Sequence, residues 1–214
     1  MTRAKPAATA IIGALTSAIL VGTTGCAGQA DTPAPATTAP SSSTVTTTMR
    51  IEKPDKLLGT WTESVDRGFH DRAEQDMGTF KKLLSAEPTS AMGTAYVQAK
   101  EVYSPERGLH IPGDDQRVIL ISAVSGTITD PTAALHETFA GLPKVTDMAP
   151  IKPGPLGGVA GCGTAPAKTG IPVDICVWSD HQTLGMVTFV GFAKTDDPQG
   201  VFGQIRAELE QPAR

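Results

Sequence analysis

Serine, aspartate and histidine stand side by side in the segment Trp178-Ser179-Asp180-His181. These residue types perform acyl transfer in hydrolases, where an aspartate orients the histidine that takes the proton of the attacking serine. Such triads are assembled in space, whereas neighbouring residues of an extended chain point to opposite faces. Asp180 and His181 therefore cannot both reach Ser179, and we predict no catalytic residues in this segment.

We interpret the same segment as a turn between two strands. An aspartate at the first position of a turn accepts hydrogen bonds from backbone N–H groups further along the chain, which suits Asp180 before Thr183. Trp178 would then be a core aromatic residue and His181 a turn residue. Contact of Trp178, Asp180 and His181 with a ligand or partner is the alternative.

The cysteine pattern predicts one disulfide and no metal site. Cys162 and Cys176 are separated by thirteen residues and would pair in an oxidising compartment. Closing a loop of that size is worth about 3 kcal/mol. A zinc site would need two further ligands, and the chain has no CxxC or HxxxH spacing. Nothing in the sequence indicates a cofactor.

Residues 1–25 have the features of a secretory signal peptide. Arg3 and Lys5 precede an apolar run over 7–22, and small residues then lead to Cys26. A lone cysteine in this place is typical of lipoproteins. We predict that the leader is removed, that Cys26 carries an acyl chain such as palmitate, and that the protein is anchored to the cell membrane on its extracytoplasmic face.

The cleavage region leaves one alternative open. Thr23 stands where such leaders usually have leucine, and ordinary cleavage after Ala27 or Ala30 would give a secreted protein. An uncleaved membrane anchor is disfavoured, because the apolar run of residues 7–22 is shorter than the roughly 20 residues that span a bilayer.

Composition divides the remaining chain into a tether, 26–49, and a single domain, 50–214. The tether is mostly Ala, Thr, Pro and Ser with Asp31 as its one charge, a composition typical of disordered linkers. With Arg3, Lys5 and Asp31 set aside, the domain has 16 Lys/Arg and 21 Asp/Glu. This acidic balance argues against a nucleic-acid partner, which requires a basic patch.

Apolar spacing predicts three helices and several strands. The helices cover 65–84, 131–141 and 198–209, and the last two begin with the Asp-Pro pairs that favour a cap followed by proline. The predicted strands cover residues 57–62, 94–103, 117–125, 144–149, 157–162, 173–179 and 184–192. Short Gly/Pro connections favour antiparallel pairing. We expect an α+β fold with a mostly antiparallel sheet of about five to seven strands, two or three packed helices and one disulfide.

Three segments resemble a known domain: Gly154-Pro155-Leu156-Gly157-Gly158, Cys162-Gly163-Thr164, and the stretch 173–185, which contains a C-x-W-x-D-H-x-T-x-G pattern. They are similar to an actinobacterial extracytoplasmic domain of unknown function, found in lipoproteins and on single-pass membrane proteins. The resemblance covers about half of the mature chain. It implies an extracytoplasmic location and leaves the activity open.

Two loops are candidates for a binding surface. The segment 104–116 contains His110 among polar, Gly and Pro residues, and the segment 163–172 lies between the cysteines. Binding residues concentrate on such loops, and the two would frame a shallow site if they share an edge of the sheet. We predict a non-catalytic cell-envelope module that binds a small ligand or an envelope protein. The alternative is an envelope hydrolase built around His110 or His181.

Overall fold

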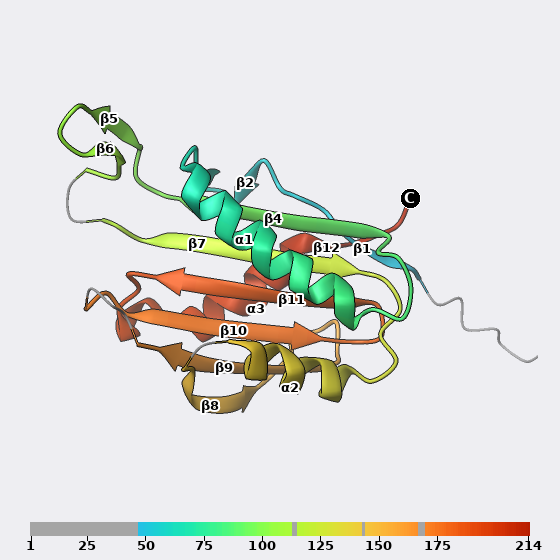
Figure 1. The fold of residues 1–214 in the computed structure, drawn as a ribbon. Helices are drawn as coiled ribbons and strands as arrows, with labels where there is room; N and C mark the ends of the chain where they lie inside the picture. Colours follow the sequence, from blue (N-terminus) through green and yellow to red (C-terminus); the bar gives the residue numbers. More distant parts are fainter. Residues whose placement is uncertain (1–46, 113–114, 143, 167–169) are drawn as a thin grey trace, which may run out of the picture. The chain divides into compact units, whose positions relative to one another are not determined.

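The computed structural model describes residues 47–214 except 113–114, 143 and 167–169 (Figure 1). The predicted signal peptide, the acylation site Cys26 and most of the predicted tether lie outside the described residues. Among the helices of the described part, none is long and apolar enough to cross a membrane.

The main sheet has eight strands, and every neighbouring pair is antiparallel. In spatial order they are β2 (Lys56–Leu57), β3 (Trp61–Glu63), β4 (Ser90–Val97), β7 (Val118–Ser125), β11 (Thr183–Val190), β10 (Val173–Ser179), β9 (Val159–Ala165) and β8 (Thr146–Ile151). The predicted α+β class with an antiparallel sheet is confirmed. The strand count is higher than expected because the segment 57–62 turns back on itself at Leu58 and Gly59, both with positive φ, and supplies two strands.

Two small ribbons accompany the sheet. The strand β1 (Met49–Ile51) pairs with β12 (Glu210–Pro212), so regular structure begins inside the segment assigned to the tether. The strand predicted over 94–103 ends at Val97. The residues after it form a separate hairpin of β5 (Val102–Ser104) and β6 (Gly108–His110) beyond the end of the main sheet (Figure 1).

The helices begin where their capping residues stand. Asp130 accepts a hydrogen bond from Ala133 N–H at the start of α2 (Pro131–Gly141), and Asp197 accepts one from Gly200 N–H at the start of α3 (Pro198–Leu209). Both Asp-Pro starts were correctly predicted.

The first helix is shorter than the apolar spacing predicted. Asp66 caps α1 (Arg67–Phe80), and a short 3₁₀ turn, η1 (Lys81–Leu83), follows it. Val65 therefore precedes the helix, and it is 71% exposed rather than part of the apolar face. A second 3₁₀ turn, η2 (Lys194–Asp196), leads into α3.

The sheet is covered on both faces. Helices α1 and α2 pack on one face and α3 on the other (Figure 1). All eight residues of β7 are buried: Leu120 and Val124 face α1 and α2, whereas Ile119 and Ile121 join the core under α3. The strand predicted over 117–125 is therefore a central strand that is buried on both faces.

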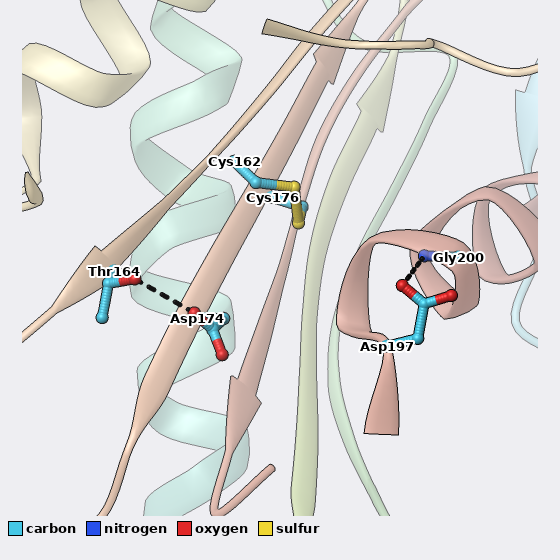
Figure 2. Close-up of a disulfide and its surroundings, with 6 residues drawn as sticks. All are labelled: Cys162, Thr164, Asp174, Cys176, Asp197 and Gly200. Atoms are coloured by element: carbon cyan, nitrogen blue, oxygen red, sulfur yellow. Dashed lines mark hydrogen bonds between the residues drawn. A yellow bond between two sulfur atoms is a disulfide. The ribbon is translucent and has the colours of Figure 1, made fainter. Parts of the chain in front are cut away.

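The predicted disulfide between Cys162 and Cys176 is present. The two residues lie directly opposite each other on β9 and β10, with 4.1 Å between their Cα atoms (Figure 2). Strand pairing continues past them to Ala165 and Val173. The bridge therefore ties two strands in mid-length and not, as expected, the base of a loop at residue 163.

Candidate functional site

A cavity of about 720 Å³ opens at the end of the sheet where β10 turns into β11. The turn residues Asp180, His181 and Gln182 form part of its wall, together with the loop before β9 and the start of α2. We call it the turn cleft; its lining residues are Met49, Pro131, Thr132, Pro155, Leu156, Gly158, Val159, Asp180, His181, Gln182 and Glu210.

The Asp180 carboxylate organises the turn. Its Oδ1 accepts hydrogen bonds from the backbone N–H groups of Gln182, at 2.6 Å, and Thr183, at 2.8 Å. This is the aspartate turn that the sequence predicts. Its Oδ2 accepts from Thr183 Oγ1 at 2.8 Å and from Arg206 Nη2 at 2.7 Å. With four donors around it, Asp180 is committed to holding the turn.

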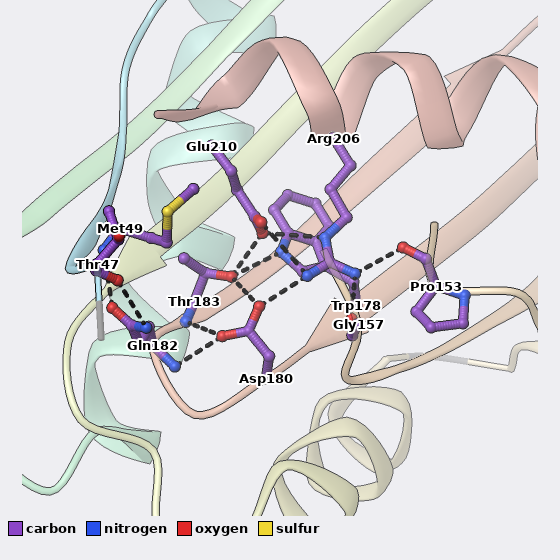
Figure 3. A network of polar contacts seen from close by, with 10 residues as sticks. All are labelled: Thr47, Met49, Pro153, Gly157, Trp178, Asp180, Gln182, Thr183, Arg206 and Glu210. Atoms are coloured by element: carbon purple, nitrogen blue, oxygen red, sulfur yellow. Dashed lines mark hydrogen bonds and ion pairs between the residues drawn. The ribbon is translucent and has the colours of Figure 1, made fainter. Parts of the chain in front are cut away.

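The guanidinium of Arg206 stands behind the cleft and is 1% exposed. It donates to Glu210 through Nε and Nη2, to Asp180 through Nη2, and to the carbonyls of Pro153 and Gly157 through Nη1 (Figure 3). These contacts use all five of its N–H groups. Arg206 thereby joins α3, the loop before β9 and the β10–β11 turn into one wall.

Trp178, which the sequence analysis gave as a core residue or a ligand contact, lies in this wall and not on the surface. Trp178 is fully buried, its indole N–H donates to Thr183 Oγ1 at 3.1 Å, and the Arg206 guanidinium lies over its ring. Gly185 faces it across the strands, and a Cβ there would lie 2.1 Å from the indole ring. The Trp, Asp, Thr and Gly of the C-x-W-x-D-H-x-T-x-G pattern thus form one interlocking unit.

The glycine run before β9 fits the same unit. Gly158 has a φ of +85°, and a Cβ there would lie 2.4 Å from the Ser179 carbonyl oxygen. The preceding residue, Gly157, offers its carbonyl to Arg206 at 2.8 Å. Close backbone approach therefore explains Gly158, while Gly154 and Gly157 share its positive φ.

The buried carboxyl group of Glu210 completes the network. Its contacts with Thr183 indicate whether it is protonated. Thr183 Oγ1 lies 2.5 Å from Glu210 Oε1 and 2.8 Å from Asp180 Oδ2, and it already accepts the indole N–H of Trp178. A hydroxyl donates only one hydrogen. The second contact therefore lacks a hydrogen unless one of the two carboxyl groups is protonated, and Glu210 is the more deeply buried of the two. Burial raises the pKa of Glu210 despite the opposing effect of Arg206, which favours its protonated form.

His181 offers the cleft its one imidazole. The ring is exposed, and Nδ1 lies 3.1 Å from the Ile128 carbonyl oxygen. Nδ1 must carry the hydrogen of that bond, so in the neutral ring Nε2 is a hydrogen-bond acceptor. Ser179 Oγ is buried and has no hydrogen-bond partner among the described residues. The side chains of Ser179, Asp180 and His181, whose types suggested a triad, therefore lie in different environments.

His110 lies at the opposite end of the sheet. It belongs to β6, its Nδ1 bonds to the carbonyl of Gly108 at 3.0 Å, and it lines a cavity of about 340 Å³ with Ile111 and Ile171. Described residues of both predicted loops, His110 and Ile111 from 104–116 and Ile171 from 163–172, therefore lie together at this end of the sheet. The structure brings Trp178, Asp180 and His181 together and leaves His110 apart from them.

The sequence analysis missed Arg206 and Glu210. Arg206 directly follows the core residue Ile205 and is four residues after Phe202, a spacing that places it on the buried face of the helix. Glu210 follows four residues later, the spacing of a helical ion pair. A charged pair inside an apolar stripe was the available signal.

Among the described residues, no group of three or more His, Cys, Asp or Glu side chains is placed to hold a metal ion. Comparison of the chain with family models, with curated proteins and with solved structures found no match.

Proposed function

We propose that this chain is a non-catalytic accessory module of the cell envelope that binds a small ligand or an envelope protein in the turn cleft. An acyl chain on Cys26 would hold it at the extracytoplasmic face of the cell membrane. The resemblance of residues 154–185 to an actinobacterial extracytoplasmic domain and the signal-like leader support the location. The disulfide between Cys162 and Cys176 fits an oxidising compartment.

The observation that carries the binding role is the preformed wall of the turn cleft. Arg206 uses every donor on protein acceptors, and Asp180 accepts four hydrogen bonds from the protein. Groups engaged in this way hold a shape instead of performing proton transfer. A preorganised cavity binds with little ordering cost.

The rim supplies the groups that a ligand would meet. Leu156 is 40% exposed and offers apolar surface, while the exposed ring of His181 offers the Nε2 acceptor. The backbone of Thr132 lies in the first turn of α2. An apolar contact beside a few directed polar groups is typical of ligand pockets.

Native mass spectrometry of the full chain, extracted gently from its own membrane, tests this function. We expect an acyl mass on Cys26, a two-hydrogen deficit from the disulfide, and a co-purifying ligand or protein. A chain cut after Ala27 or Ala30 without an acyl group would contradict the anchor. An acylated chain that carries no bound species from its native membrane would contradict the binding role.

A further inference from the structure

A second surface lies on the opposite face from α3. A cavity of about 400 Å³ adjoins the 340 Å³ cavity at His110, and both are lined by Phe69, Ile171 and Val190. Together they form one continuous groove, which we call the α1 groove. Its lining residues come from α1, from the sheet and from the segment around β6, and none of them lines the turn cleft.

The floor of the α1 groove is an apolar part of the sheet. The half-buried Val173 and Val190 line it above the buried Leu120 and Met186. One ion pair, Arg72 with Asp76 at 3.0 Å, stands at the side. A concave site with mainly apolar walls and a few polar groups is typical of a binding groove.

The hairpin end of the α1 groove carries two carboxylates, Asp66 and Glu101. Asp66 accepts from Gly68 N–H, and Glu101 accepts from Ser64 Oγ and Val65 N–H. All these donors are neutral, and among the described residues neither carboxylate has a cationic partner within 4.0 Å. Two ordered carboxylates without a cationic side-chain partner among the described residues therefore stand at one end of an apolar groove.

We propose that the α1 groove binds a protein segment whose apolar side chains lie on the sheet and whose basic residues meet Asp66 and Glu101. Charge complementarity selects the cationic end of the segment and its direction. Exposed apolar side chains flank the same end: Val65 is 71% and Tyr103 is 75% exposed. Tyrosine is enriched at protein interfaces, so the surroundings favour a protein over a lipid.

Fluorescence polarisation of the full chain with two labelled peptides tests the proposal. The probes are KKVSVSVS and its acidic counterpart EEVSVSVS. We expect the basic peptide to bind at least about tenfold more tightly, with an affinity that falls as salt is raised, because exposed charges are screened. Equal binding of the two peptides, or binding that is insensitive to salt, would overturn the charge assignment.

Variants separate the charged end from the floor. Asp66→Asn keeps a capping side chain while removing its charge, and combined with Glu101→Gln it should weaken the basic peptide about fivefold to tenfold. Asp71→Asn, on an exposed part of α1, is the matched control and should change nothing. Thr188→Arg would fill the groove, and Thr62→Arg on β3 is its control.

The outcome for Thr188→Arg decides whether the floor is used. We expect loss of peptide binding with an unchanged circular dichroism spectrum. Peptide binding that survives Thr188→Arg would refute the site. If Thr188→Arg instead abolishes binding to phosphatidylcholine vesicles and the peptides do not bind the wild type, the groove takes lipid and the proposal is wrong.

Discussion

Replacing Glu210 with glutamine tests whether the network behind the turn cleft contains a shared proton. Glutamine has nearly the shape of a protonated glutamate. An amide NH₂ in the place of Oε1 donates to Thr183 Oγ1, and the carbonyl in the place of Oε2 accepts from Arg206 Nη2, but the hydrogen bond that Oε1 accepts from Arg206 Nε is lost. If the folded protein already holds Glu210 protonated, the substitution keeps the hydrogen bond to Thr183 and loses only the one from Arg206 Nε. We expect a loss of about 1–2 kcal/mol in the free energy of unfolding at acidic pH.

The matched substitution Asp180→Asn should be far more damaging. Every oxygen lone pair that Asp180 uses faces a donor, so an amide NH₂ would point at Arg206 or at the backbone N–H groups of the turn. It would also remove the closer counterion of a buried guanidinium. Breaking a buried pair in this way costs about 3–5 kcal/mol.

The sign of the pH dependence follows from the raised pKa of Glu210. Because burial raises this pKa above its ordinary value of 4.5, protonation stabilises the folded state. This contribution is complete below the pKa of the unfolded chain and is lost as the pH rises through the pKa of the folded protein. The stability of the wild type relative to Glu210→Gln should therefore fall with rising pH.

Urea unfolding of the wild type and both variants, over a pH series from about 4 to 8, measures these differences. The comparison with Glu210→Gln isolates Glu210 from the other titrating groups. A wild type that gains stability over Glu210→Gln as the pH rises would show that Glu210 is ionised. A loss of about 3–5 kcal/mol for Glu210→Gln at acidic pH would also contradict a protonated Glu210 in the folded protein.

Three further substitutions test other parts of the fold by urea unfolding. Arg206→Met leaves the buried carboxylate of Glu210, the half-buried carboxylate of Asp180 and two carbonyls without their donor and should cost about 3–5 kcal/mol, whereas an effect below about 1 kcal/mol would show that the wall does not depend on it. Gly185→Ala places a Cβ against Trp178 and should cost about 1–3 kcal/mol, and a neutral effect would contradict the packing. The double change Cys162→Ala with Cys176→Ala should cost about 3 kcal/mol, and reducing agent should destabilise the wild type equally but leave the variant unchanged.

Local rules of the sequence were sufficient wherever one residue type has one dominant structural role. The Asp-Pro pairs at 130 and 197 begin helices, Asp180 forms its predicted turn, and Cys162 pairs with Cys176. Each of these features depends on residues close in the sequence or, for the disulfide, on an oxidising environment. Tertiary packing therefore changes them little.

Predictions failed where distant contacts decided the outcome. Leu58 adopts a positive φ within the β2–β3 turn, where its N–H donates to Glu208, a residue 150 positions away. The burial of Arg206 depends on carbonyls of the loop before β9 and on Asp180. A single sequence shows a charged residue in an apolar stripe but not the acceptors that permit its burial.

The most direct test of the turn cleft compares two matched substitutions in protein extracted from its own membrane. Leu156→Arg fills the rim of the cleft, whereas Met148→Arg introduces the same charge at another exposed apolar residue, on β8. Native mass spectrometry should show the bound species on the wild type and on Met148→Arg, and its loss from Leu156→Arg. Retention of the bound species by Leu156→Arg would contradict binding in the turn cleft.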